Sequence, residues 1–415
     1  MNPKRKIALI HRYGLEGWIC CGGHAVPGMI DRLAEECEIH FHGPRSAEPK
    51  NPALRARLRM HELPFRYDRA NPRDKITKTL LWYLFLPLVA LRCRLAGIQL
   101  IWNDETVPLV APVLRLFFGR KIAITVMDFF MRIYTENRPR LHRIRDLVER
   151  IDLAAWRKAD LLFTKVEYTQ TVLAARGVPK DLMRLYRNPV DHEKFHPIDE
   201  ATRRATRERF GFSDADLVLT HHGILHPNKG NDWLLRRLAE FRVPDPGVRV
   251  PLPKLLLVGN GPEMPHLKRL AEELGIADRV VFAGWLPSER ELNDALASAD
   301  VGLVMRIGQE TDHFHMTDTL AHEMACAKPI LAVDLRGIAE VVDGRTNGFL
   351  FSPDDPGGFL EKLRLLASDV DLRRRFGEAA LQTARNECDV DRCAARLTKT
   401  LLSALGSAQP SKIPN

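Results

Sequence analysis

The feature that most constrains this chain is an alternation of short, β-rich apolar runs with longer stretches of helical spacing. The second half contains the runs LVLTHHG, KLLLVGNG, RVVFAG, DVGLVM and PILAVD, with helical patterns between them. The first half repeats the alternation with KIALIH, EIHFHG, IQLIWND, KIAITVMD and ADLLFTK. Strands separated by helices of roughly 10–20 residues predict parallel sheets covered by helices. We therefore expect an α/β protein built on two doubly wound parallel sheets.

The length of the chain indicates two domains. A single compact core rarely serves 415 residues, because such chains divide into separately packed units. The Asn-Pro and His-Pro steps in YRNPVDHEKFHPIDE mark a linker. We predict two facing Rossmann-like domains, residues 1–188 and 189–388, with a cleft between them. Residues 389–415 are expected to form a helix that crosses back to the first domain, followed by a disordered tail.

Charge is unevenly divided between the two halves. Residues 1–190 hold 33 Lys and Arg against 19 Asp and Glu, a net +14, and residues 191–415 hold 29 against 34, a net −5, which agrees with the total of +9. A basic first half would suit nucleic acid, an anionic membrane or an acidic substrate. Basic residues are also ordinary solvated surface, so this interpretation stays open.

Several sequence features indicate a cytoplasmic protein. The N-terminal stretch MNPKRKIALIHRYG is too short and polar for a signal peptide. The longest apolar run, LLWYLFLPLVAL at 80–91, has twelve residues and a proline, whereas a bilayer span needs about 20 residues. No transmembrane helix is therefore expected. The seven cysteines show no C-x-x-C spacing, which fits free thiols in a reducing compartment.

Ligands in open α/β sheets bind beyond the carboxyl ends of the strands. The residues that come directly after the predicted strands are therefore the candidates for binding. Some would suit phosphate, because glycine turns and lysines before a helix can approach an anion. A plain tight turn or an exposed lysine explains the same residues equally well. The candidates after the strands are Gly22, Gly23, Lys229, Gly259, Asn260 and Trp285.

Glu323 is the one carboxylate in a run otherwise rich in Leu, Ala and Met, LAHEMA, within HMTDTLAHEMACAKPILAVD. The helix that contains this run comes after the polar loop behind DVGLVM, so its positive N-terminal end points to the same edge of the sheet. A carboxylate there can accept two hydroxyls of a ribose or a sugar. The alternative is a surface glutamate on an amphipathic helix.

Several motifs of the second half occur together in one protein family. The segment NPVDHEKFHP resembles Asn-x-Val-Asp-x-x-x-Phe-x-Pro, and GILHPNKGNDWLL resembles Gly-Arg-Leu-x-x-x-Lys-Gly-x-x-x-Leu-Leu. The segment HEMACAKPILAVDLRGIAEVVDGRTNGFLF resembles Glu-Ala-Met-Ala-x-Gly-x-Pro-Val-Val-Ala, then Glu-Val-Val and Gly-x-x-Gly. These motifs resemble the retaining GT-B glycosyltransferases of the glycosyltransferase group 1 (GT4) family. The likeness covers residues 185–405 well and the first half loosely.

The resemblance implies a site for a nucleotide-diphospho-sugar donor in the second domain. In that family the helix glutamate, by position Glu323, holds the ribose hydroxyls, and the lysine at Lys229 contacts the diphosphate. The base lies against Trp285 and Leu286, and backbone N–H groups before the helix hold the phosphates. The remaining donor-binding residues expected are Gly22, Gly23, Gly223, Gly259, Asn260, His315, Met316, Thr317, Asp318 and Thr319.

Two positions depart from the family pattern. The partner of Glu323, eight residues earlier, would be a glutamate, and this chain has His315. The arginine that precedes the family lysine is replaced by Ile224. His315 could carry positive charge beside the phosphates, since such neighbours raise its pKa. Alternatively, the first glutamate is dispensable in this chain.

The resemblance implies transfer of a sugar to a hydroxyl with retention of the anomeric configuration. Lys229 and the helix N-terminus can stabilise the diphosphate leaving group, so no metal and no cofactor are expected. The donor phosphate itself takes the acceptor proton. The Asp-x-Asp triplets beginning at 214, 369 and 389 are interpreted as turns and helix caps. Two alternatives remain, an inactive donor-binding protein and a nucleotide-sugar epimerase of the same fold.

The first half is expected to hold the acceptor, a saccharide, glycolipid or lipid-linked saccharide of the cell surface. Asp128, in TVMD, is the candidate acceptor contact, together with the Gly22-Gly23 loop. Residues 55–78 hold eight basic residues against three acidic ones and lie next to the apolar run. We expect this segment to rest on the anionic inner face of the membrane, although the apolar run could instead be a buried helix. Nucleic acid is not an expected partner.

Overall fold

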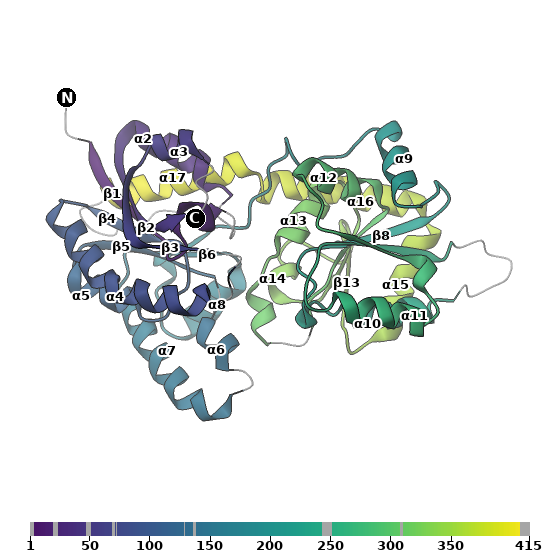
Figure 1. Cartoon of the computed structure of the whole chain (residues 1–415), viewed down its shortest axis with the longest axis horizontal. Helices are drawn as coiled ribbons and strands as arrows, with labels where there is room; N and C mark the ends of the chain where they lie inside the picture. The colour runs from purple at the N-terminus through teal and green to yellow at the C-terminus, as the bar shows by residue number, and fades with distance from the viewer. Residues whose placement is uncertain are drawn as a thin grey trace. The chain divides into compact units, whose positions relative to one another are not determined.

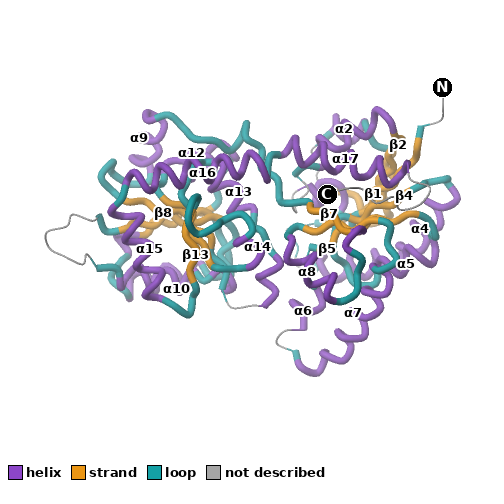
Figure 2. The backbone as a smooth tube through the Cα atoms, turned by 180° about the vertical axis from the view of Figure 1, so that it is seen from behind, coloured by secondary structure: helices purple, strands orange, loops and turns teal. Residues whose placement is uncertain are grey.

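The computed structural model divides into two compact units, residues 1–188 with 390–415 and residues 189–389 (Figure 1). Each unit is described by itself. In both, strands lie in the middle and helices cover them on either side (Figure 2). The two predicted α/β units with parallel sheets are therefore confirmed. The residues that the structure describes are 4–19, 24–46, 51–68, 71, 73–127, 129–135, 138–242, 251–307 and 310–406.

The first unit is built on a seven-stranded sheet with the order β3-β2-β1-β4-β5-β6-β7. Every neighbouring pair of strands is parallel. The reversal of order between β1 and β4 is the topological switch point, where ligands bind in such sheets. The strands are β1 (Arg5–Ile10), β2 (Cys37–Ser46), β3 (Arg59–Tyr67), β4 (Leu100–Asn103), β5 (Lys121–Val126), β6 (Leu161–Thr164) and β7 (Met183–Leu185).

The last helix of the chain, α17 (Val390–Gly406), belongs to the first unit and packs against α2 (Val26–Glu36). Leu397 and Leu401 of α17 join the buried cluster around Trp18 and Trp102. The other helices of this unit are α1 (Gly14–Ile19), α3 (Pro52–Ala56), α4 (Asp74–Leu95), α5 (Val110–Phe117), α6 (Phe130–Thr135), α7 (His142–Trp156) and α8 (Glu167–Ala175), with short 3-10 helices η1 (Pro139–Leu141) and η2 (Lys180–Leu182).

Helix α4 has two contrasting faces. Trp82 and Leu86 on one face are completely buried, whereas Leu80 and Leu84 on the other are 64% and 72% exposed. The predicted apolar run is thus buried on one face only. By length and composition alone, Ile76–Leu95 could cross a membrane, but this is only weak evidence for a span. The buried face packs on β3 and α5 of the same unit.

The second unit has a six-stranded sheet with the order β10-β9-β8-β11-β12-β13. All its neighbouring strands are parallel. Here the order reverses between β8 and β11, so the residues after these two strands occupy the switch point. The strands are β8 (Leu217–His222), β9 (Pro253–Val258), β10 (Val280–Gly284), β11 (Val301–Val304), β12 (Ile330–Val333) and β13 (Gly348–Phe351).

Side-chain caps set the starts of several helices in the second unit. Ser288 accepts a hydrogen bond from Glu291 N–H at 3.1 Å, as its spacing predicts. Asp369 accepts one from Leu372 N–H at 2.7 Å, so this member of an Asp-x-Asp triplet is a helix cap. The helices are α9 (Glu200–Arg209), α10 (Asn231–Glu240), α11 (Met264–Glu273), α12 (Glu289–Ser298), α13 (Asp318–Ala325), α14 (Arg336–Ala339), α15 (Pro356–Ser368) and α16 (Val370–Glu387), with η3 (Pro227–Lys229), η4 (Ala277–Arg279) and η5 (Glu310–Phe314).

Candidate functional site

The loops after β8 and β11 are fastened together at the switch point of the second unit. Ile307 N–H donates a hydrogen bond to the Asn228 carbonyl at 3.0 Å. Gly230 has a φ of +62°, and a Cβ there would lie 2.7 Å from the Ile307 side chain. Only glycine allows this close approach. Lys229, between Asn228 and Gly230, is thereby held next to the residues after β11.

Two cations meet at this point. Burial, followed by the nearby charge of Arg306, lowers the pKa of Lys229 to about 8, against the opposing effect of Asp312 and Asp318. The Lys229 ammonium makes no ion pair within the described part of the chain. Arg306 pairs with the buried Asp312 at 2.6 Å, and its Nε is buried without a hydrogen-bond partner among the described residues. The uncompensated charge of Lys229, next to Arg306 with its unbonded Nε–H, favours an anionic ligand.

Sequence reasoning missed Arg306. From the sequence we expected one cation at the diphosphate in place of two, because Ile224 stands where the family has arginine. The Ile224 side chain is 54% exposed. The second cation comes instead from the loop after β11, where the sequence reads MRIG. The signal was present, since Arg306 is among the first residues beyond a predicted strand at the switch point.

His315 lies beside these two cations but does not carry the charge that we expected. Burial lowers its pKa to about 3, and the charges of Arg306 and Lys229 lower it further. The ring is therefore neutral at pH 7 in this structure. The expectation of a raised pKa assumed bound phosphate, and the groups around His315 here are cationic.

A cavity of about 280 Å³ opens next to this switch point. It is lined by residues at the ends of three neighbouring strands, among them Gly223 after β8 and Trp285 and Leu286 after β10. Trp285 is 60% exposed, which leaves its ring accessible. If Gly223 carried a Cβ atom, the nearest other atom would lie 4.0 Å from it, so the space above this glycine is open. The volume and apolar lining suit a flat ring.

Gly259 and Asn260, which the sequence predicts as donor contacts, have a structural role in this unit. A Cβ on Gly259 would lie 1.9 Å from the Gly223 carbonyl, and Leu225 N–H donates to the Asn260 carbonyl at 3.0 Å. The Asn260 side chain is exposed and accepts from Gly261 N–H at 2.8 Å. These residues hold the loop after β8 in place, and the cavity beside Trp285 is lined by others.

The N-terminus of α13 faces the same edge of the sheet. Thr317 is the N-cap and accepts from Leu320 N–H at 3.4 Å. Thr319 is buried and donates from Oγ1 to the His222 carbonyl at 3.1 Å. Met316 is also buried, and Asp318 is half-buried. The hydrogen bond from Thr319 fixes the predicted phosphate-binding turn, Met316 to Thr319, against the end of β8.

Glu323 lies in the core, and the expectation that it holds a ribose requires correction. Its side chain is completely buried and accepts hydrogen bonds from Thr220 Oγ1 at 2.9 and 3.1 Å. The space above Gly302 of β11 is filled by this side chain. Burial raises the pKa of Glu323 well above its usual range. No ligand can reach a carboxylate enclosed in this way.

The register of the motif explains the error. When Met324, Ala325 and Pro329 are matched to Met-Ala-x-Gly-x-Pro, the family glutamate falls on His322, and the family glycine falls on Ala327. Ala327 has a φ of +55°, a conformation in which glycine is preferred. The backbone therefore supports this register, and the glutamate eight residues earlier then corresponds to Phe314 rather than His315.

His322 is half-buried and joins a polar chain that leads out of the core. Its Nδ1 lies 3.1 Å from His222 Nε2, and its ring stacks on Phe195 at 3.8 Å between centroids. His222 Nδ1 lies 3.6 Å from the Glu323 carboxylate. Since His222 also lines the cavity beside Trp285, His322 is the residue of this helix best placed to meet a ligand there.

The switch point of the first unit holds a second group of buried polar residues. Arg12, after β1, pairs with Glu105, after β4, at 2.7 Å, and its backbone N–H also donates to Glu105 at 2.7 Å. Asp104 accepts from Trp18 Nε1 at 2.7 Å. The predicted residues Gly22, Gly23 and Asp128 lie outside the described part of the chain. Arg12 and Glu105 were missed, although both come directly after strands that the sequence predicts.

Comparison with known proteins agrees with this geometry. Residues 216–369 match the family described as Glycosyl transferases group 1. A GDP-mannose-dependent alpha-(1-6)-phosphatidylinositol monomannoside mannosyltransferase from Mycolicibacterium smegmatis is 34% identical over 191 residues, 45% of this chain and 48% of the relative. D-inositol 3-phosphate glycosyltransferase 2 from Catenulispora acidiphila is 33% identical over 204 residues, 48% of this chain and 45% of the relative. The chain thus matches about half the length of these curated relatives.

Solved structures resemble the fold of the whole chain. Anabaena HepE in complex with UDP and glucose has a TM-score of 0.70 at 17% identity, covering 96% of this chain and 100% of that one. Sucrose-phosphate synthase from Thermosynechococcus elongatus also has a TM-score of 0.70, at 20% identity, covering 97% and 100%. The fold class is therefore GT-B. Within it, residues 216–369 of the second unit resemble the group 1 glycosyltransferases.

Proposed function

We propose that this protein transfers a sugar from a nucleotide-diphospho-sugar to a hydroxyl acceptor. The observation that carries the proposal is the nearness of an open cavity to two cations at one switch point. His222 lines the cavity at Trp285. Burial, followed by the charge of Lys229, lowers the pKa of His222, and Lys229 lies beside Arg306. The cavity accepts the base against Trp285 and Leu286. The diphosphate then lies over the cations and the N-terminus of α13, where helix dipole and ammonium act together.

Stabilisation of the leaving diphosphate is the main electrostatic task of this reaction. Lys229 and Arg306 are already in place before the bond breaks, so they need little rearrangement as negative charge develops. His315, neutral in the empty site, sits where a bound diphosphate would raise its pKa and allow it to donate a hydrogen bond. The transfer proceeds with retention, and the donor phosphate accepts the proton of the acceptor hydroxyl.

The proposed contact with the ribose is His322. It occupies the position of the family glutamate once the motif is matched through Ala327, and it is linked to His222 on the wall of the cavity. A histidine offers one ring nitrogen where a carboxylate offers two oxygens. We therefore infer a weaker hold on the ribose and a larger share of donor binding for the diphosphate.

The acceptor is proposed to be a saccharide or a lipid-linked saccharide, received by the first unit. Arg12 and Glu105 occupy its switch point as a buried pair, where sugar hydroxyls can bond to both a donor and an acceptor group. The mannosyltransferase relative from Mycolicibacterium smegmatis is named for a phosphatidylinositol acceptor, which supports a lipid-borne substrate.

Helix α4 is proposed to rest on the cytoplasmic face of a membrane. Six apolar residues at spacings of three or four form an exposed stripe along it, and apolar side chains on the neighbouring helices α5 and α7 are exposed as well. Cations at the C-terminal end of α4, Arg92 and Arg94, suit anionic headgroups. The stripe consists of Ile76, Leu80, Leu84, Leu88, Leu91 and Leu95.

Three of the eight cations in residues 55–78, the segment that the sequence favoured for membrane contact, are paired with carboxylates of the protein. Arg55 pairs with Glu16 and Glu62, and Arg59 pairs with Glu38 at 2.8 Å. Arg57 faces Asp31 at 3.6 Å. Pairs of opposite charge attract anionic lipid less than free cations do, so the proposed membrane face is moved from this segment to the α4 stripe.

Titration calorimetry with UDP, GDP and the matching nucleosides tests donor binding. A second experiment measures hydrolysis of UDP- and GDP-sugars without acceptor, with the anomeric configuration of the released sugar read by proton NMR. Retained configuration together with diphosphate-dependent binding supports the proposal. Release of the inverted sugar, or equal affinity for nucleoside and nucleotide, refutes the assignment of site and reaction.

A donor-binding protein without transferase activity is the second candidate. Phe314 and His322 at the positions of the two family glutamates favour it. Binding of a nucleotide sugar without hydrolysis or transfer to any acceptor would select this candidate. Conversion of the free nucleotide sugar to its 2-epimer would instead select an epimerase of the same fold.

A further inference from the structure

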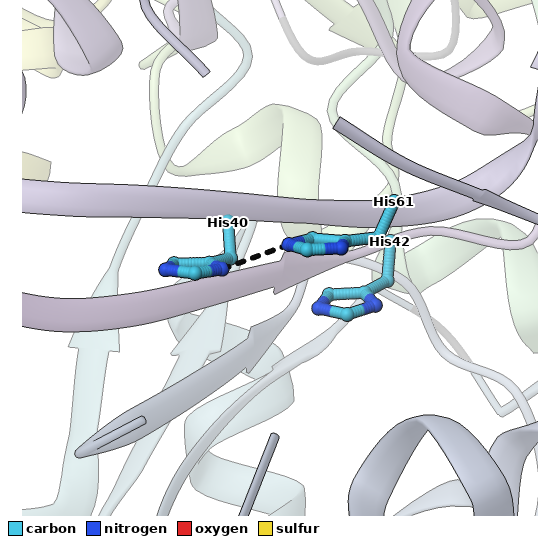
Figure 3. A group of neighbouring side chains, drawn as sticks. All are labelled: His40, His42 and His61. Atoms are coloured by element: carbon cyan, nitrogen blue, oxygen red, sulfur yellow. Dashed lines mark hydrogen bonds between the residues drawn. The ribbon is translucent and has the colours of Figure 1, made fainter. Parts of the chain in front are cut away.

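Three histidines gather on one face of the edge of the first sheet, whereas the residues proposed above for donor binding belong to the second unit. His40 and His42 lie two residues apart on β2, and His61 on β3 pairs in register with His42. Because side chains alternate along a strand, all three project from the same face. Figure 3 shows the three imidazoles side by side in nearly parallel planes. One nitrogen from each ring lies within 4.8 Å of the others.

The rings of His40 and His61 point directly at one another. His40 Nδ1 lies 2.8 Å from His61 Nε2, and the planes differ by 1° (Figure 3). His40 Nε2 lies 2.9 Å from the Glu38 carboxylate, which must accept its proton. The lone pair of His40 Nδ1 is therefore directed at His61. A carboxylate that fixes the tautomer of a histidine in this way is the usual outer partner of a metal ligand.

A cavity of about 560 Å³ lies against these rings. Val89, Arg92 and Cys93 of α4 form its opposite wall, and Cys93 Sγ lies 3.4 Å from His42 Nε2. Bonds of roughly 2.0–2.3 Å at tetrahedral angles separate nitrogen and sulfur ligands by roughly 3.3–3.6 Å. The thiol lies at ligand spacing from His42 alone, since Cys93 is not part of the group of ligand atoms that lie within 4.8 Å of one another. To hold one ion, the two facing nitrogens need to separate by about half an ångström, and the rings need to turn so that their lone pairs converge.

The charge state of the cluster favours a metal over an anion. Burial lowers the pKa of His42 to about 3, and it also lowers the pKa of His40 and His61. Neutral imidazole is the form that binds a metal ion. The charge of Arg59 is already paired with Glu38. Arg92, on the cavity wall, carries the positive charge that opposes the binding of a metal ion.

We propose that His40, His42 and His61 bind a divalent transition metal of the zinc class, with a solvent molecule in the fourth position. The ion enters past His61, which is exposed, whereas His40 and His42 are buried. On binding, His61 moves its proton to Nδ1 so that Nε2 can coordinate. The site would join β2 to the edge strand β3.

Titration of the metal-free full-length protein with Zn²⁺ alone, measured by calorimetry, tests this proposal. One ion should bind per chain, and Zn²⁺ should raise the melting temperature. His61→Ala should lose at least about 100-fold in affinity, since even outer partners of metal ligands cost 10–100-fold. His61 is exposed, so this change leaves the fold intact. His266→Ala, which removes an exposed histidine of α11, is the matched control and should bind as wild type.

Co²⁺ substitution reports the ligands directly. Wild type should show the visible bands of four-coordinate cobalt without a thiolate charge-transfer band in the near ultraviolet. Cys93→Ser should leave this spectrum unchanged, whereas His61→Ala should abolish the visible bands. Visible bands of equal intensity in wild type and His61→Ala would refute coordination by the imidazoles. Equal Zn²⁺ affinity of wild type and His61→Ala, or equal losses for His61→Ala and His266→Ala, would refute the imidazole site and indicate adventitious binding by surface histidines.

Discussion

The two units have the same kind of sheet but place their buried polar groups differently. In the second unit the polar groups at the switch point leave charge uncompensated, since Lys229 has no ion pair among the described residues. In the first unit Arg12 and Glu105 neutralise each other at 2.7 Å. In the proposed function, this difference lets the second unit take an anionic donor and the first a neutral, hydroxyl-rich acceptor. Changes of charge should therefore affect ligand binding in the second unit and stability in the first.

The largest expected effect tests whether Glu323 belongs to the core or to the donor site. Glu323→Ala removes a buried side chain and leaves Thr220 without its acceptor, which should cost about 2–4 kcal/mol of unfolding free energy. Denaturant unfolding measures this cost. Glu323→Gln, which keeps the size and the acceptor oxygen, is the control and should recover most of the stability.

Nucleotide binding by Glu323→Ala distinguishes a role of Glu323 in the core from a role in the donor site. Folded Glu323→Ala should bind UDP and GDP as wild type does, because the carboxylate is enclosed. His322→Ala should instead weaken both nucleotides and nucleosides. If Glu323→Gln is fully stable but binds nucleosides tenfold less tightly, the carboxylate reaches the ribose and our correction is wrong.

The next effect concerns the two cations of the second unit. Lys229→Gln and Arg306→Gln should each weaken nucleoside diphosphate binding by about 1.5–3 kcal/mol, roughly tenfold or more, because each removes a charged hydrogen bond. Nucleoside binding should stay unchanged, since the base and ribose do not touch these residues. Calorimetry with UDP or GDP and the corresponding nucleoside provides both values.

A matched control makes the charge argument specific. Arg236→Gln removes an exposed cation from α10 of the same unit and should leave diphosphate binding within twofold of wild type. If Arg306→Gln binds the diphosphate as tightly as Arg236→Gln does, Arg306 is not the second cation at the diphosphate. The diphosphate would then be held by Lys229 and the α13 N-terminus alone.

A smaller effect is expected from the pKa of Lys229, which burial lowers to about 8. Below pH 8 the ammonium is charged and binds the diphosphate; above it, the free protein must first take up a proton. Affinity for UDP or GDP should therefore fall as pH rises from 8 to 10, by up to tenfold per unit. Lys229→Gln should flatten this profile. A wild-type profile that is already flat over this range would place the Lys229 ammonium outside the phosphate contacts.

The fold was predictable because it depends on many residues, whereas single site residues were predictable only in part. Alternating apolar runs predict both sheets, since each strand contributes several side chains to the pattern. The position of Lys229 is evident from its loop motif. Glu323 was wrong by one position, because the glutamate next to the family position was taken for the family glutamate. Met324, Ala325 and Pro329 already fix the register in the sequence, and the positive φ of Ala327 agrees with it.

Contacts between distant segments were beyond the reach of sequence reasoning. Arg306 lies 77 positions after Lys229 in the chain, and only the packing of Ile307 against Gly230 brings their loops together. The cluster of His40, His42 and His61 depends on the register of β2 against β3, which no spacing in the sequence specifies. Likewise, the ion pairs of Arg55 and Arg59 with glutamates of other segments remove charge that the sequence presents as free.

The smallest expected effect tests the membrane face of the first unit. Leu84→Ser removes one exposed apolar side chain from the α4 stripe and should weaken flotation with anionic vesicles several-fold, because burial of such a side chain contributes about 1.5–3 kcal/mol at most. Stability should not fall, since Leu84 is 72% exposed. Arg57→Glu, in the basic segment of residues 55–78, serves as the comparison and should alter flotation less than Leu84→Ser. The reverse order, with Arg57→Glu abolishing flotation and Leu84→Ser without effect, would return the membrane face to the basic segment. It would also mean that charge governs ligand contact in both units, which would remove the contrast between them.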